Sequence, residues 1–170
     1  MDNLYIVAGG VVGAILAFVI WKPLRARLRV REEARAMQSF RVQREQLEAK
    51  FFDLASTQGK PRGLTWRDCD WQSGVVFARD VQSGLLTALV AVNIRFEAVA
   101  GGDMESVEAV GLIRDAAAVF HFRRGRWGTG GKALFNMNPA EALKRLEGQY
   151  RPVFSKLSPP NDVQSGTRIH

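Results

Sequence analysis

Few side chains in this sequence are suited to chemistry, and they are scattered along it. The two histidines are His121, between two phenylalanines on a predicted strand, and His170. The single cysteine, Cys69, stands between Asp68 and Asp70, whose charges would raise the pKa of its thiol. An activated nucleophile needs the opposite shift. We therefore expect His121 and Cys69 to be structural residues.

The standard catalytic, metal and phosphate-binding motifs are each missing a member. One cysteine and two histidines cannot build a zinc site. The acidic stretch 103–108 lacks the glycine and the terminal glutamate of an EF-hand loop, and the glycines of 128–131 are not followed by the Lys-Ser/Thr pair of a phosphate loop. We expect a protein that is not an enzyme and that uses no cofactor or metal.

Aromatic residues of the predicted sheet could line an apolar ligand pocket. They are Trp66, Phe77, Phe96, Phe120, Phe122 and Trp127. A small domain also needs residues of this kind simply to fill its core. A small-molecule or lipid-binding module that uses the concave face of the sheet is therefore the alternative to an interaction domain.

The elements that must position these residues begin with an uncharged apolar run, residues 4–21, which predicts a transmembrane helix. Its 18 residues span about 27 Å as a helix, close to the roughly 30 Å of a hydrocarbon core. Leu4 and Tyr5 begin the run and Trp21 ends it, and aromatic rings favour the headgroup region. No basic residue precedes the run and no small-residue cleavage site follows it, which favours an anchor over a signal peptide.

Basic residues follow the apolar run at once and predict its orientation. Residues 22–31 contain no acidic residue and five basic ones: Lys22, Arg25, Arg27, Arg29 and Arg31. By the positive-inside rule the N-terminus should lie outside and the following domain on the cytoplasmic side of the inner membrane. We also expect these five residues to contact lipid headgroups.

The expected partners are the membrane itself and another membrane or membrane-associated protein. Gly9, Gly13 and Ala17 recur every fourth residue, which would let two spans pack closely as a homodimer, although small residues are also common in unpaired spans. The net charge of +7 raises the question of nucleic acid. However, residues 60–150 hold 12 basic and 10 acidic residues, so we expect no nucleic-acid partner.

Residues 22–57 predict a basic juxtamembrane helix, because after Pro23 they contain no glycine or proline. Its second half carries an apolar stripe that only Arg44 interrupts: Met37, Phe40, Leu47, Phe51 and Leu54. A parallel coiled coil and packing on the following domain both fit this stripe. The wide Phe51-Phe52 pair and the small number of heptads favour packing on the domain.

Beyond the turn-forming residues 56–63 the apolar period changes to two and predicts strands at 64–71, 75–80, 85–99, 115–123 and 126–137. The third would be about 50 Å long, so we expect a bend or bulge in it. Asn138 and Pro139 then start a helix expected to reach Tyr150.

The predicted fold is α+β: an N-terminal transmembrane helix and helical stalk, then a curved antiparallel sheet of four or five strands with helices on one face. The predicted boundaries are an outside tail at 1–3, the span at 4–21, the juxtamembrane helix at 22–57, the α+β domain at 60–153 and a disordered tail at 154–170.

Residues 85–135, with long strands followed by the hairpin AAAVFHFRRGRWGTGGKALF, resemble the sheet half of the cystatin-like and nuclear-transport-factor-like group of folds. The resemblance implies long bent strands and a concave face that often encloses an apolar cavity. The whole layout resembles single-span bacterial membrane proteins with a small cytoplasmic domain. Together these features favour a membrane-anchored, non-enzymatic interaction or scaffold domain.

Overall fold

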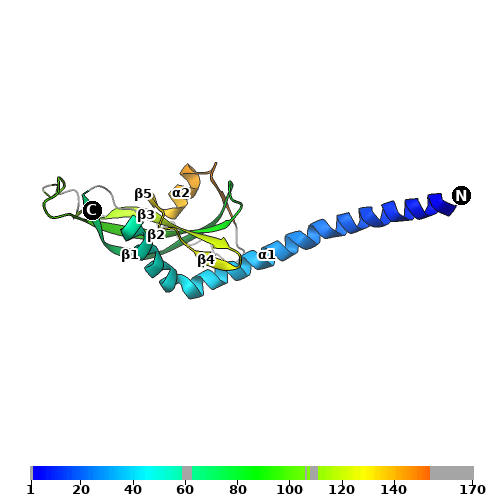
Figure 1. Cartoon of the computed structure of the whole chain (residues 1–170), viewed down its shortest axis with the longest axis horizontal. Coiled ribbons are helices and arrows are strands. Elements are labelled where there is room, and N and C mark those ends of the chain that lie inside the picture. Colours follow the sequence, from blue (N-terminus) through cyan, green and yellow to red (C-terminus); the bar gives the residue numbers. More distant parts are fainter. Residues whose placement is uncertain (1, 59–62, 106, 108–110, 154–170) are drawn as a thin grey trace, which may run out of the picture.

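The structure is a computed structural model that describes residues 2–58, 63–105, 107 and 111–153, with the backbone alone for 2–20 and 22–26. One long helix runs into a sheet that also carries a short second helix, so the α+β class is confirmed (Figure 1). In chain order the elements are α1 (Asp2–Gln58), β1 (Leu64–Asp80), β2 (Leu86–Ala98), β3 (Arg114–Arg123), β4 (Arg126–Gly128), β5 (Ala133–Phe135), α2 (Pro139–Arg145) and β6 (Tyr150–Pro152).

The strands form one antiparallel sheet in the order β4-β3-β2-β1-β6, with β5 beside β4 on the same edge of β3. The described residues thus hold six strands, where four or five were expected. The two strands predicted at 64–71 and 75–80 are one strand, β1. The strand predicted at 126–137 is divided by its glycines into β4 and β5, and β6 was not predicted.

β1 contains two bulges that hide its continuity in the sequence. The register moves from Trp66↔Phe96 to Asp68↔Arg95, which leaves one extra residue on β1. It moves again from Trp71↔Val92 to Val75↔Val90, which leaves two extra residues. Bulges bend a strand and increase its twist. The bulge was expected within the strand at 85–99, and that expectation was wrong, because the extra residues at both register shifts lie on β1.

Arg44 connects α1 to the second bulge. Its guanidinium donates a hydrogen bond to the backbone carbonyl of Gln72, and its Nε lies 2.5 Å from a carboxylate oxygen of Glu48. A bulged carbonyl has no partner in the sheet ladder and needs one elsewhere. The charged residue that interrupts the apolar stripe of α1 therefore supports the irregular part of β1.

Most of that stripe packs against one face of the sheet. Four of its residues are at most 6% exposed and belong to one cluster with Val90 and Phe120: Met37, Phe40, Leu47 and Phe51. Ala36 and Ala55 of α1 join the same cluster, while Leu54 is only partly buried. The prediction that the stripe packs on the domain is confirmed. The N-terminal part of α1 extends away from the sheet (Figure 1).

Helices cover both faces of the sheet, so the expectation of helices on one face was wrong. Leu89, Ala117 and Val119 point away from α1 and pack with Ala142 of α2. The reason is that β2 and β3 are apolar on both faces in their central parts. The capping box of Asn138 and Glu141 begins α2 as predicted.

α2 is shorter than predicted. It ends at Arg145, and Tyr150, expected to be the last helical residue, instead begins β6 and is 1% exposed.

Candidate functional site

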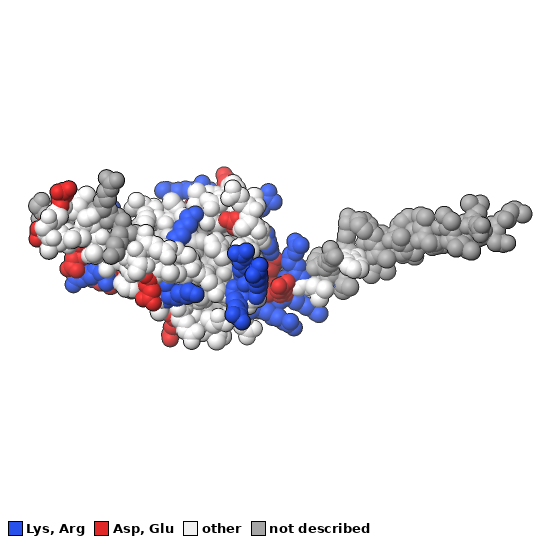
Figure 2. Space-filling view, viewed as in Figure 1, with Lys and Arg blue, Asp and Glu red and all other residues white. Residues whose placement is uncertain are grey.

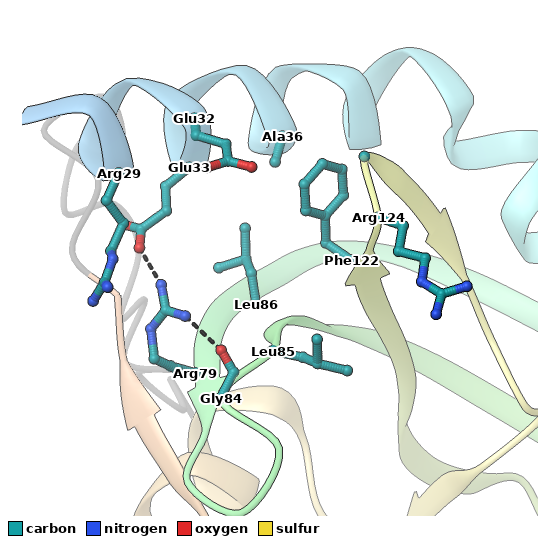
Figure 3. A pocket seen from close by; sticks show the side chains of 11 residues that line it. Arg29, Glu32, Glu33, Ala36, Arg79, Gly84, Leu85, Leu86, Phe122 and Arg124 are labelled. Atoms are coloured by element: carbon teal, nitrogen blue, oxygen red, sulfur yellow. Dashed lines mark hydrogen bonds and ion pairs between the residues drawn. The ribbon is translucent and has the colours of Figure 1, made fainter. Parts of the chain in front are cut away.

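A groove and two smaller hollows lie at the end of the sheet from which α1 leaves. A groove of about 460 Å³ separates α1 from the β1–β2 turn and the β3–β4 hairpin (Figure 3). Arg29, Glu32 and Glu33 of α1 form one wall, while Leu86 and Arg124 stand on the sheet side. The groove therefore brings together residues almost a hundred positions apart in the sequence.

An ion pair fixes the width of this groove. The Arg79 guanidinium on β1 pairs with the Glu33 carboxylate on α1 and also donates to the Gly84 carbonyl at 2.5 Å (Figure 3). Arg79 thus joins α1, β1 and the β1–β2 turn. Because its bonds are all made within the fold, we assign it a structural role.

The base of the β3–β4 hairpin is attached to α1 by aromatic side chains. Trp127 is 7% exposed, and its indole N–H donates a 2.7 Å hydrogen bond to the Ala36 carbonyl. Its ring lies 4.8 Å from that of Phe40 and 5.3 Å from that of Phe122. The hairpin is therefore held in a defined position against α1.

The tip of this hairpin carries three exposed arginines, which we call the arginine hairpin: Arg123, Arg124 and Arg126. Side chains alternate across a strand, so the residues next to Phe122 and Trp127 point away from α1. Arg123 and Arg126 are register partners, and the three arginines line a hollow of about 440 Å³. Within the described part of the chain, no acceptor lies in hydrogen-bond or ion-pair reach of their guanidinium groups.

The arginine hairpin departs twice from the residues that best suit such a turn. Arg124 has φ 51° and Gly125 has φ 79°, a pair of left-handed residues for which Asn-Gly is the preferred sequence. An L-residue other than Asn or Asp pays roughly 1–2 kcal/mol in this region. Moreover, like charges at directly opposed positions, as in Arg123 and Arg126, are destabilising. Conflicts of this kind are typical of functional positions.

His121 lies beside the arginine hairpin on the same face of β3. It lines a hollow of about 300 Å³ with Arg123 and Arg126, and its Nδ1 lies 3.1 Å from the Thr87 hydroxyl. Burial lowers the pKa of the imidazole, while the charge of Asp80 acts to raise it. The hollow thus combines two guanidinium groups with an imidazole, a set of donors suited to an anion.

Asp80 is not free to act as a catalytic partner for His121. One of its carboxylate oxygens accepts hydrogen bonds from the Ser83 amide at 2.7 Å and from the Ser83 hydroxyl at 2.8 Å. The bond from the Ser83 amide is the main cause that lowers the pKa of Asp80. Asp80 therefore stabilises the β1–β2 turn as a carboxylate.

Burial raises the pKa of the Cys69 thiol to about 12, and the charge of Asp68 is the second cause. From the sequence, a raised pKa was expected on account of the acidic neighbours alone, whereas burial is the larger cause. The thiol stays protonated near neutral pH, which does not suit a nucleophile. Across the described residues, no group of three or more His, Cys, Asp or Glu is placed to hold a metal ion.

The structure does bring the predicted pocket-lining residues together. Trp66, Phe77, Phe96, Phe120 and Trp127 are each at most 9% exposed, and with the partly buried Phe122 they join the core that α1 covers. Phe77, Phe122 and Trp127 also border surface hollows. Their role as a ligand pocket stays a prediction.

Most residues predicted to anchor the chain lie outside those whose side chains are described: Leu4, Tyr5, Gly9, Gly13, Ala17, Lys22 and Arg25. Trp21 is 56% exposed, and Arg27, Arg29 and Arg31 are exposed on α1. Where side chains are described, no helical stretch is both long and apolar enough to cross a bilayer. The tail predicted at 154–170 and the one at 1–3 also fall wholly or largely outside the described side chains.

The arginine hairpin was not predicted as a site, although its residues were visible as a basic turn. The sequence does not show that this turn lies beside the part of α1 that leaves the sheet. The available signals were an arginine where a type I′ turn prefers asparagine, and two arginines placed to face each other across the hairpin. No protein-family model, curated protein or solved structure matches this chain.

Proposed function

We propose that this protein is a membrane-anchored, non-enzymatic interaction domain, with its N-terminus outside and its α+β domain on the cytoplasmic face of the inner membrane. The observation that carries the proposal is that α1 is one unbroken helix from Asp2 to Gln58. It joins the apolar run 4–21 to the core residues between Ala36 and Ala55 without an intervening linker. An anchor built into the core of a domain holds that domain close to the bilayer.

The length of α1 between anchor and core supports this arrangement. Ala36 follows Trp21 by fifteen positions, which is about 22 Å of helix. That distance exceeds the headgroup layer, about 5–8 Å on each side of a bilayer. With α1 perpendicular to the bilayer, the core would therefore begin about 14–17 Å beyond the headgroups, and the end of the sheet from which α1 leaves would be nearest to them.

The opposite end of the sheet carries exposed apolar side chains that suit a protein partner. The β2–β3 loop and its flanks lie far from the N-terminal part of α1 (Figure 1). Five large apolar residues there are between 39% and 62% exposed: Val99, Met104, Val107, Leu112 and Ile113. Grouped exposure of this kind marks interaction surfaces. We place the contact with a membrane or membrane-associated protein at this end.

The anchor is tested by charged substitutions in the apolar run. Val12→Arg combined with Leu16→Arg should move the chain from the membrane to the soluble fraction, because each arginine near the centre of a span costs about 2.5–3.5 kcal/mol of insertion free energy. The measurement is resistance to alkaline carbonate extraction, followed by protease protection in inverted and right-side-out vesicles. Val12→Leu with Leu16→Ile is the matched control. Release of the unaltered chain by carbonate, or cleavage of its domain only from outside, would contradict the proposal.

The partner surface is tested by crosslinking in native membranes. Leu112→Ser with Ile113→Ser should reduce the yield of a stoichiometric crosslinked product several-fold, because the apolar contact area is lost. Val42→Ser is the control, since Val42 is 82% exposed and belongs to α1 and not to that loop. A homodimer would be identified by its mass and by its loss in Gly13→Ile. Recovery of no stoichiometric partner would remove the interaction role.

A further inference from the structure

We propose that the arginine hairpin is a second contact with the membrane, in which Arg123, Arg124 and Arg126 bind the phosphate groups of anionic lipids beside the basic stretch of α1. The inference rests on the proposed membrane anchoring and adds to it a site on the folded domain. It assigns the hairpin a ligand of defined chemistry, a lipid phosphate, and gives the domain a fixed orientation on the bilayer.

The three guanidinium groups of the arginine hairpin are available to bind an anion. All three side chains are exposed, and the described part of the chain supplies none of them with a carboxylate or carbonyl acceptor. By contrast, Arg44 and Arg79 use their guanidinium groups for bonds within the fold. A planar guanidinium with free donors is the group best suited to phosphate oxygens.

The stability of the fold does not explain why arginine occupies these three positions. The turn would be better served by asparagine at position 124, and Arg123 and Arg126 repel each other as register partners. Bound phosphate would remove that repulsion, because two guanidinium groups can share one anion. The hollow of about 440 Å³ that they line with Arg124 is large enough for a phosphate group.

The arginine hairpin also lies beside the part of α1 that leaves the sheet. Arg124 lines the same groove as Arg29, and Arg29 follows Trp21 by eight residues, about 12 Å of helix. Once the headgroup layer of about 5–8 Å is subtracted, the gap at Arg29 is shorter than a Debye length of about 8 Å. The base of the hairpin lies farther along α1, at Ala36, so the hairpin reaches the lipid when α1 tilts toward its side, and helical spans tilt by about 20° on average. Figure 2 shows basic side chains gathered at the end of the domain from which α1 leaves. Glu32 and Glu33 lie on the groove, but Glu33 is paired with Arg79, and neither borders the hollow of the arginine hairpin.

The test places a fluorophore beside the hairpin in the full chain. Gly130→Cys in a Cys69→Ser background provides the attachment point, because a Cβ at Gly130 meets nothing within 4 Å. The chain is reconstituted in vesicles of phosphatidylcholine alone, or of phosphatidylcholine mixed with phosphatidylglycerol, each doped with a lipid that carries a headgroup nitroxide. We expect strong quenching in the mixed vesicles and weak quenching in phosphatidylcholine alone.

Removal of the three charges should reverse this result. In the triple variant Arg123→Gln, Arg124→Asn, Arg126→Gln, we expect the ratio of docked to undocked domain to fall about 100-fold, from a roughly fivefold contribution per arginine. The matched control removes three exposed basic residues elsewhere on the domain, Arg41→Gln, Lys50→Gln and Arg67→Gln, and should keep most of the quenching. The triple variant should have a Tm equal to or above that of the parent, since its turn and cross-strand pair are relieved.

Each contrary outcome has a defined meaning. Equal quenching in both lipid mixtures, or equal loss in the control variant, overturns the lipid site while the chain stays in the vesicles. A chain that does not stay in the vesicles overturns the proposed anchoring instead. A lower Tm in the triple variant would show that the arginines serve folding. Retention of a labelled oligonucleotide that depends on the arginine hairpin would assign the site to nucleic acid and overturn the lipid contact.

Discussion

Phe40→Ala is expected to lower the free energy of unfolding of the domain by about 3–5 kcal/mol, a large part of the stability of a small domain. Phe40 is 0% exposed, and its ring contacts three others from the sheet: Phe77 at 5.7 Å, Phe120 at 5.5 Å and Trp127 at 4.8 Å. Truncation leaves a cavity where α1 meets the sheet. Urea unfolding of the full chain in detergent micelles, followed by tryptophan fluorescence, measures the loss.

Val42→Ala is the control for this prediction, because Val42 lies two residues away on the same helix and is 82% exposed. Its effect should stay within about 0.5 kcal/mol. A loss below about 1 kcal/mol for Phe40→Ala would contradict the assignment of α1 to the core.

Gly131→Ala should destabilise the domain by about 2–5 kcal/mol, from a left-handed backbone and from overpacking. Gly131 has φ 74°, and a Cβ at this position would lie 2.8 Å from the backbone nitrogen of Ala55 and 3.0 Å from the carbonyl carbon of Leu54. Both are backbone atoms of α1 and cannot rotate away. The measurement is the urea midpoint of the variant against that of the parent.

The neighbouring glycine supplies a close control. A Cβ at Gly130 meets nothing within 4 Å, and its φ is outside the left-handed range, so Gly130→Ala should be neutral or slightly stabilising. Equal effects of the two substitutions would show that the β4–β5 connection does not touch α1.

Much of this fold could be predicted because its larger elements have a clear apolar period. The stripe from Met37 to Phe51, the alternation from Leu86 to Ala98 and the capping residues at Asn138 all appear where the sequence predicts them. The bulges of β1 shift the alternation, so one strand resembles two. β6 has only three residues and owes its place to pairing with Ala78–Asp80, which no local pattern encodes.

The candidate site was harder to predict than the fold. A basic turn at Arg123–Arg126 can be read from the sequence, and so can the conflict of Arg124 with its turn type. The position of this turn beside α1 cannot be read from the sequence, because the contact of Trp127 with Ala36 joins residues 91 positions apart. The same contact turns the aromatic face of the hairpin toward α1 and the two facing arginines away from it.

The unbroken backbone of α1 has a mechanical consequence. A domain on a loose tether samples every orientation, whereas here one continuous helix joins the apolar run 4–21 to the core, and it changes direction where it packs on the sheet (Figure 1). A helical span changes its tilt when the thickness of the surrounding bilayer changes. In the anchored state that we propose, the β2–β3 end of the sheet would swing with that tilt, so that a thicker or thinner bilayer would alter how far this end stands from the lipid surface.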